Sequence, residues 1–210
     1  MVPTPSPAPP DAYRPGAVRV MSLGWWLLSA VLAGDVLVNG EPGGGQLLGL
    51  AVLALGCAVV HAVFWQPEVQ VDDGGVVLVN VLRRVRLPWS AVDDLDTRWA
   101  LSIGSGGRRW TSWAAPASGR RLRPVSRRET PWAERGAEAI AGSRAPGSSA
   151  GEAAVLVGTA WQRWKDSPVA RRVATGEAGT PEVRWNAPVL VSLTVTSGLV
   201  LLGALLLGLS

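Results

Sequence analysis

The sequence predicts an α+β membrane protein with three transmembrane helices and one soluble domain. Three apolar runs are each long enough to cross a bilayer, and the stretch between the second and third runs alternates apolar with polar residues as β-strands do. Of its 210 residues, 48% are hydrophobic, more than a soluble protein of this charge needs. The excess lies in the three runs.

The first run covers residues 20–38 and the second covers 46–65. A rise of about 1.5 Å per residue takes each across a hydrocarbon core of about 30 Å, and the short link at 40–45 predicts an antiparallel helical hairpin. Residues 1–19 form a proline-rich segment that we expect to be disordered. A cleaved signal peptide is the competing interpretation of the first run, but the long leader and the second run directly behind it favour a retained span.

The third run, residues 187–209, contains no charged residue. Because basic residues that flank spans stay in the cytoplasm, Arg14 and Arg19 place the N-terminus inside. The segment 66–186 holds 18 basic and 13 acidic residues, so we expect it to be cytoplasmic too. The C-terminus then lies outside, and the protein is predicted to be a multi-pass protein of the cell membrane.

Aromatic and ionisable residues in the spans fit this orientation. Tryptophans prefer the headgroup region, and four lie near the predicted inner ends of the spans: Trp25, Trp26, Trp65 and Trp185. Asp35 and His61 lie at opposite depths, so we expect each to reach its own interface rather than to form a proton relay.

After Trp65 the pattern changes to the alternation of a β-meander over residues 66–115. Strands are predicted at 67–72, 75–80, 84–89, 97–103 and 108–115, with a short helical turn at 89–95. In the third strand Val85 and Leu87 point to one side and Arg84 and Arg86 to the other. Five tryptophans are predicted to belong to the core: Trp89, Trp99, Trp110, Trp113 and Trp164.

Residues 116–147 are rich in Pro, Gly, Ser and Arg, which predicts a basic flexible loop. A helix is predicted at 148–166, where Ser149 and Glu152 have the spacing of a capping box. Its apolar side would close one end of the strands. Residues 167–186 are expected to be a linker to the third span.

The strand segments "GVVLVN", "LRRVRLPW", "SAVDDLDTRW" and "RRWTSWAAPA", followed by the "WQRW" helix, resemble actinobacterial membrane proteins that carry a bacterial pleckstrin-homology (PH) domain. These domains are described as the low molecular weight protein antigen 6 type. The similarity covers residues 14–115 and 161–164. It implies a non-enzymatic PH-like antiparallel β-barrel or sheet, closed by a C-terminal helix and attached to two N-terminal spans and one C-terminal span.

The residues that catalysis or metal binding requires are sparse. The single histidine and the single cysteine, His61 and Cys57, both lie in a span, so we expect no catalytic residue, no cofactor and no metal site. Asp93, Asp94 and Asp96 lack the spacing of a calcium loop and are expected to solvate a turn. The charge of the soluble segment is too balanced for a nucleic-acid partner.

Three functions remain. The first is recruitment or scaffolding of a protein partner, by pairing with an exposed sheet edge. The second is binding of an anionic lipid surface, and the third is an accessory role in a membrane transport or secretion complex. The candidate surface for a lipid or a partner consists of eight arginines: Arg83, Arg84, Arg86, Arg120, Arg121, Arg123, Arg127 and Arg128. For those in the loop 116–147, the competing interpretation is that they are simply solvated.

Overall fold

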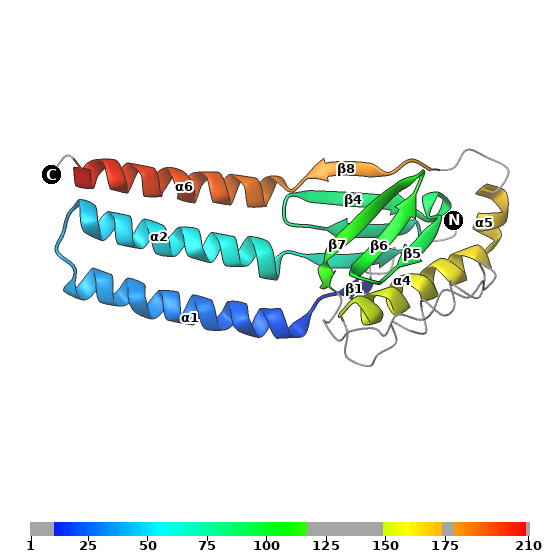
Figure 1. Cartoon of the computed structure of the whole chain (residues 1–210), viewed down its shortest axis with the longest axis horizontal. Helices are drawn as coiled ribbons and strands as arrows, with labels where there is room; N and C mark the ends of the chain where they lie inside the picture. The colour runs from blue at the N-terminus through cyan, green and yellow to red at the C-terminus, as the bar shows by residue number, and fades with distance from the viewer. Residues whose placement is uncertain (1–10, 117–148, 174–178, 209–210) are drawn as a thin grey trace, which may run out of the picture. The chain divides into compact units, whose positions relative to one another are not determined.

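The computed structural model describes residues 11–116, 149–173 and 179–208. These residues form two compact units (Figure 1). A helical unit contains residues 15–67 and those from 185 onward, and a soluble unit contains residues 11–14 and the described part of 68–184. Each unit is described by itself below.

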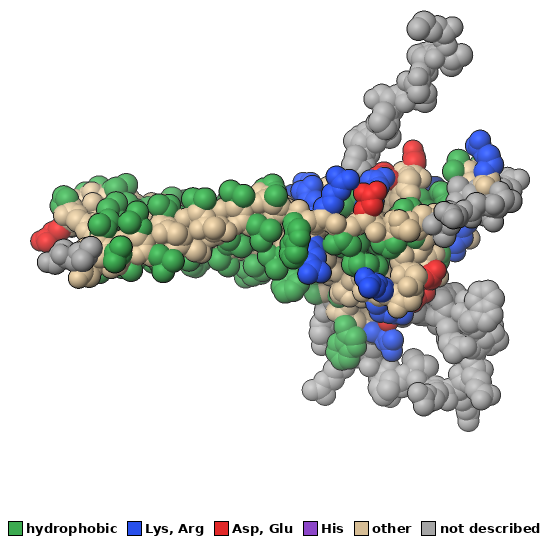
Figure 2. Space-filling model, turned by 90° about the horizontal axis from the view of Figure 1, so that it is seen from above, with side chains coloured by type: hydrophobic (Ala, Val, Ile, Leu, Met, Phe, Trp, Pro, Cys, Tyr) green, Lys and Arg blue, Asp and Glu red, His purple; other side chains and the backbone are tan. Residues whose placement is uncertain are grey.

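The helical unit consists of α1 (Gly16–Asn39), α2 (Gly44–Val60) and α6 (Ala187–Gly208), with α2 continued by one π-helical turn, His61–Trp65. The stretches Val18–Asn39, Gly44–Trp65 and Ala187–Gly208 are each 22 residues long and apolar enough to cross a membrane. The three predicted spans are therefore confirmed as helices. Most of the side chains on the visible face of these helices are apolar (Figure 2).

In the helical unit α2 packs against both α1 and α6. The approach of α2 to α6 is close where glycines face a neighbouring backbone. A Cβ atom added to Gly203 would lie 3.0 Å from Leu48 Cα, and one added to Gly44 would lie 2.8 Å from the Leu207 nitrogen. Small residues allow such backbone contact between helices in a membrane.

The soluble unit contains two sheets. The first has the strand order β1-β2-β3-β4-β8, and its strands β1 to β4 pair antiparallel. Its strands are β1 (Asp11–Tyr13), β2 (Glu68–Asp72), β3 (Gly75–Val79), β4 (Arg83–Pro88) and β8 (Glu182–Trp185). Opposite one another across four strands stand Tyr13, Val69, Leu78 and Val85, so one face of this sheet is apolar.

The second sheet has the order β5-β6-β7, all antiparallel. Its strands are β5 (Asp94–Asp96), β6 (Ala100–Ser105) and β7 (Arg108–Pro116). The 3₁₀ turn Trp89–Ala91 connects the two sheets. The five predicted strands are present, but they belong to two sheets rather than one meander, and the predicted helical turn at 89–95 is shorter because residues 94–96 pair with β6.

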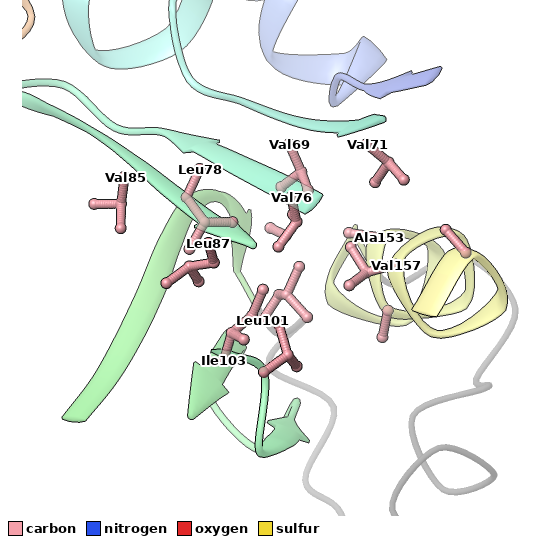
Figure 3. Packing of buried hydrophobic residues seen from close by; sticks show 14 of the residues in the cluster. Val69, Val71, Val76, Leu78, Val85, Leu87, Leu101, Ile103, Ala153 and Val157 are labelled. Carbon is pink, nitrogen blue, oxygen red and sulfur yellow. The ribbon is translucent and has the colours of Figure 1, made fainter. Parts of the chain in front are cut away.

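Helix α4 (Ser149–Lys165) packs against strands of both sheets and is followed by the short helix α5 (Pro168–Val173). Ala153 and Val157 of α4 point toward the apolar side chains of the sheets (Figure 3). The fully buried side chains of this core include Val69, Val76, Leu78, Leu87, Leu101, Ile103 and Val157. The predicted helix therefore covers the core as expected.

Two segments are more ordered than the sequence predicted. Residues 11–13 form β1 and helix α1 begins at Gly16, whereas all of 1–19 was expected to be disordered; residues 1–10 lie outside the described part. The segment 167–186, expected to be a linker, contains α5 and β8. Both strands are too short to show a clear alternation, and each gains its hydrogen bonds from a neighbour distant in sequence, β2 or β4.

The tryptophan core was predicted only in part. Trp89 is 2% exposed and its ring N–H donates to the carbonyl of Asp72 at 3.0 Å. Trp110 and Trp164 are partly buried against the core. Trp99 and Trp113 are 87% and 61% exposed, so their assignment to the core was wrong.

The strand register explains both exposed tryptophans. In β7 the neighbours of Trp113, Ser112 and Ala114, are the buried residues, so Trp113 faces outward. Trp99 has the same parity as the buried Leu101, but it precedes β6, which begins only at Ala100 and has an irregular register with β7 just beyond that residue. Trp99 therefore lies outside the strand pairing that the described residues show.

Candidate functional site

The candidate site lies at one end of the first sheet, where a tight turn joins β3 to β4. The N–H of Asn80 donates to the carbonyl of Arg83 at 2.9 Å and closes this turn. The next cross-strand row contains Glu68, Val79 and Arg84. Glu68 is the first residue of β2, so the turn lies at the end of the sheet where the chain enters from the second span.

A second connection marks the same end. Tyr13, the last residue of β1, stands opposite Val69, and helix α1 begins only three residues later at Gly16. Two residues, Gln66 and Pro67, separate β2 from the end of the π-helical turn. These two of the three crossings between span and sheet are therefore made by very short links, at the end of the sheet that carries the β3–β4 turn.

Asn80 fixes this turn to the second sheet. Its side-chain amide donates to the carbonyl of Thr111 at 2.9 Å, and its side-chain oxygen accepts from the N–H of Trp113 at 2.7 Å. One asparagine thus satisfies two backbone groups of β7 that would otherwise need a neighbouring strand. It brings the β3–β4 turn beside Trp113.

Four exposed residues belong to the two segments that Asn80 joins, and we refer to them as the turn surface: Leu82, Arg83, Arg84 and Trp113. Leu82 is 46% exposed at the tip of the turn. Large apolar side chains beside basic ones form an amphipathic surface of the kind found where proteins meet lipid headgroups or partners.

The predicted arginine surface is divided by the structure. Arg83, Arg84 and Arg86 are all exposed on β4, but Arg86 forms an ion pair with Asp72 at 3.0 Å. Arg83 and Arg84 lie at the turn instead. The loop members of the prediction lie outside the described residues: Arg120, Arg121, Arg123, Arg127 and Arg128.

The acidic turn is held by arginines rather than only by solvent. Arg109 contacts Asp94 at 2.9 Å and Asp96 at 3.1 Å, and Arg98 contacts Asp96 at 3.1 Å. Asp93 accepts from the N–H of Gly106 at 2.8 Å. These contacts give the three aspartates a structural role. In the described part of the chain no group of His, Cys, Asp and Glu side chains has the arrangement of a metal site.

The two ionisable residues of the spans have separate partners. Asp35 accepts from the side chain of Asn39 at 2.8 Å, and His61 lies 3.3 Å from the side-chain nitrogen of Gln66. His61 also stacks on Trp26, with ring centroids 6.1 Å apart. These contacts agree with the expectation that Asp35 and His61 do not form one site.

Arg19 completes an aromatic cluster at the same end of the first two spans as His61. Its guanidinium lies 4.8 Å from the centroid of the Trp65 ring, which is 4.9 Å from that of Trp26. A cation over an aromatic face is stabilising, and more so away from water. The cluster fits the predicted aromatic belt.

Sequence reasoning missed Asn80, Leu82 and the outward position of Trp113 as parts of one surface. In the sequence Asn80 is only the last residue of the predicted strand 75–80, and its contact with β7 spans 31 to 33 residues. The signal in the sequence was Leu82, a large apolar residue in the link between two predicted strands.

Comparison with models of known families, with curated proteins and with solved structures gave no match.

Proposed function

We propose that this chain is a non-enzymatic integral membrane protein that presents a PH-like domain at the cytoplasmic face of the cell membrane and recruits a protein partner there. The observation that carries this proposal is Trp99, a tryptophan that is 87% exposed and directly precedes β6. Tryptophan is the residue type most enriched among those that dominate binding energy at protein interfaces. An exposed tryptophan that the fold itself does not need is therefore best explained by a partner.

The cytoplasmic placement rests on the distribution of basic residues. The segment 66–186 contains 18 of the 20 lysines and arginines, and Arg14 and Arg19 flank the first span on the same side. The short links at residues 14–15 and 66–67 tether the domain to the bilayer. Recruitment at the membrane surface raises the local concentration of a partner without any chemistry in the domain itself.

A PH-like barrel is the finer description that we propose for the soluble unit. Two antiparallel sheets with a helix, α4, packed over their shared core support it. The strands β1 and β8 are additions that connect this plan to the spans. The likeness concerns architecture, so it assigns no ligand.

A photo-crosslinking amino acid placed at position 99 of the full-length chain in native membranes tests recruitment. We expect a discrete adduct with a second protein, because a partner that covers Trp99 lies within reach of the probe. The control carries the same probe at Asp73, which is exposed in the β2–β3 turn, and should give no such adduct.

Three outcomes would overturn the proposal. Adducts that contain only this chain would indicate a homo-oligomer, and adducts with lipid alone would favour lipid binding. Equal adducts from positions 99 and 73 would show nonspecific collision. Identification of the adduct by mass spectrometry separates these results and would also reveal a transport or secretion complex.

A further inference from the structure

We propose that the turn surface, Leu82, Arg83, Arg84 and Trp113, is a membrane-docking site that takes the headgroups of anionic lipids. None of its four residues is Trp99, the residue that the proposed function assigns to the partner. Docking there would orient the soluble domain against the bilayer. The inference shares one premise with the proposed function, namely that the three apolar helices cross a membrane.

The first argument is the way the structure holds the apolar residues in place. Leu82 lies in the turn that the Asn80 N–H closes on Arg83, and Trp113 belongs to the β7 segment that the Asn80 side chain binds. One residue therefore holds both backbone segments, although one is the β3–β4 turn and the other belongs to the second sheet. Their exposed fractions, 46% and 61%, leave apolar surface that the soluble unit does not cover.

The chemistry of the pair suits a lipid interface. Tryptophan prefers the headgroup level of a bilayer, and burial of a leucine side chain just below that level is favourable. Contact with the bilayer would remove both from water without any change in the fold. Because Asn80 already holds the two backbone segments together, docking needs little further ordering of the backbone.

The second argument is charge. Glu68, the acidic residue in the same cross-strand row as Arg84, is already paired with Arg14. Asp72 forms an ion pair with Arg86. This pair lies toward the opposite end of the sheet, because Asp72 stands opposite Gly75, which in turn stands opposite Pro88 at the end of β4. Within the described residues Arg84 forms no ion pair, so the turn presents positive charge to its surroundings.

The third argument is covalent connection. The turn lies at the end of the first sheet where β1 leaves for α1 and where β2 arrives from the second span. Each link is two residues long. Anionic lipids attract basic residues only within a Debye length of the surface, and links of two residues leave little chain between the spans and the strand ends that they join.

Depth-dependent quenching in the full-length protein tests this inference. In a Cys57→Ser background, a nitrobenzoxadiazole fluorophore is attached to Leu82→Cys, and the protein is reconstituted into nanodiscs whose lipids carry a nitroxide just below the headgroups. In discs with phosphatidylglycerol we expect quenching several-fold stronger at position 82 than at Asp73→Cys, the matched control at the opposite end of the sheet. High salt, or Arg84→Gln, should reduce the difference, and discs of phosphatidylcholine alone should show less of it.

The native Cys57, labelled in the unchanged chain, serves as the reference inside the second span. Quenching at position 57 with none at position 82 would overturn docking and leave the spans intact. No quenching at position 57 would instead contradict the shared premise that the apolar helices cross a membrane. Position 82 shielded from both the lipid nitroxide and aqueous iodide would show that a protein covers the turn, which also overturns docking.

Discussion

Asp96 shows how single residues stabilise the second sheet. Burial opposes ionisation of this carboxyl, but hydrogen bonds from Arg98 and the charges of Arg98 and Arg109 outweigh it, so the pKa of Asp96 lies below its ordinary value of 3.8. A carboxyl whose pKa is lowered by folding stabilises the folded state only while it is ionised. The contacts at 3.1 Å to both arginines carry this effect.

We expect Asp96→Asn to lower the free energy of unfolding by about 1 kcal/mol at neutral pH, because the ion pairs with Arg98 and Arg109 are partly exposed to solvent. Above the unfolded pKa of 3.8 the contribution is complete. Below that value the unfolded chain binds the proton first, so the contribution falls as pH falls and is lost below the folded pKa. Urea unfolding of the protein in detergent at pH 7 and pH 3 measures this.

The matched control is Asp73→Asn, an exposed aspartate in the β2–β3 turn. It should change stability by less than Asp96→Asn at pH 7. If the difference between the wild type and Asp96→Asn does not shrink at acid pH, the assignment of the lowered pKa is wrong.

At the scale of elements, the approach of α6 to α2 depends on glycine. A side chain at Gly203 would meet Leu48 backbone atoms at 3.0 and 3.1 Å, whereas Gly198 in the same helix has no neighbour within 4 Å. Four other glycines of the first two helices differ in their surroundings. Gly24 and Gly34 face open space, Gly49 approaches Val36, and Gly56 packs on the ring of Trp25.

We therefore expect Gly203→Ala to destabilise the helical unit by about 1 to 3 kcal/mol, since the added methyl group must push two helix backbones apart. Gly198→Ala is the matched control, and it should be neutral or slightly stabilising because alanine favours helix more than glycine does. Thermal unfolding in detergent, followed by circular dichroism, compares the two variants. Equal midpoints would show that α2 and α6 do not need the close contact.

Other elements are connected by contacts between distant segments. Burial raises the pKa of Tyr13 in β1, with Ser149 and Glu152 of α4 as its polar neighbours. The start of the described chain is thus part of the soluble unit rather than a free leader. Asn80 likewise connects the two sheets, because its side chain forms hydrogen bonds with the backbone of β7.

At the scale of the whole molecule, the orientation across the membrane is the main prediction. In a Cys57→Ser background, Glu41→Cys lies in the link between the first two helices and Asp73→Cys lies in the soluble unit. A membrane-impermeant maleimide should label position 41 in intact cells and position 73 only after the cells are opened, because positive residues hold 66–186 inside. Labelling of position 73 in intact cells would reverse the proposed topology.

The sequence by itself determined the three helices, the positions of five strands and the helix at the end of the soluble unit. These follow from local patterns: length and apolar content for the spans, alternation for the strands such as 84–89, and spacing for α4. The pairing of apolar residues such as Val85 and Leu87 in one core follows from the same alternation, because strand geometry sends alternate side chains to opposite faces.

Only the tertiary structure decided which tryptophans are buried, which arginines are paired and which residues meet at the β3–β4 turn. Trp113 faces outward because of the register of β7, and Arg86 is neutralised by Asp72, fourteen residues away. Asn80 meets Trp113 across two sheets. Register and packing depend on contacts between segments far apart in the chain, and no local pattern records them.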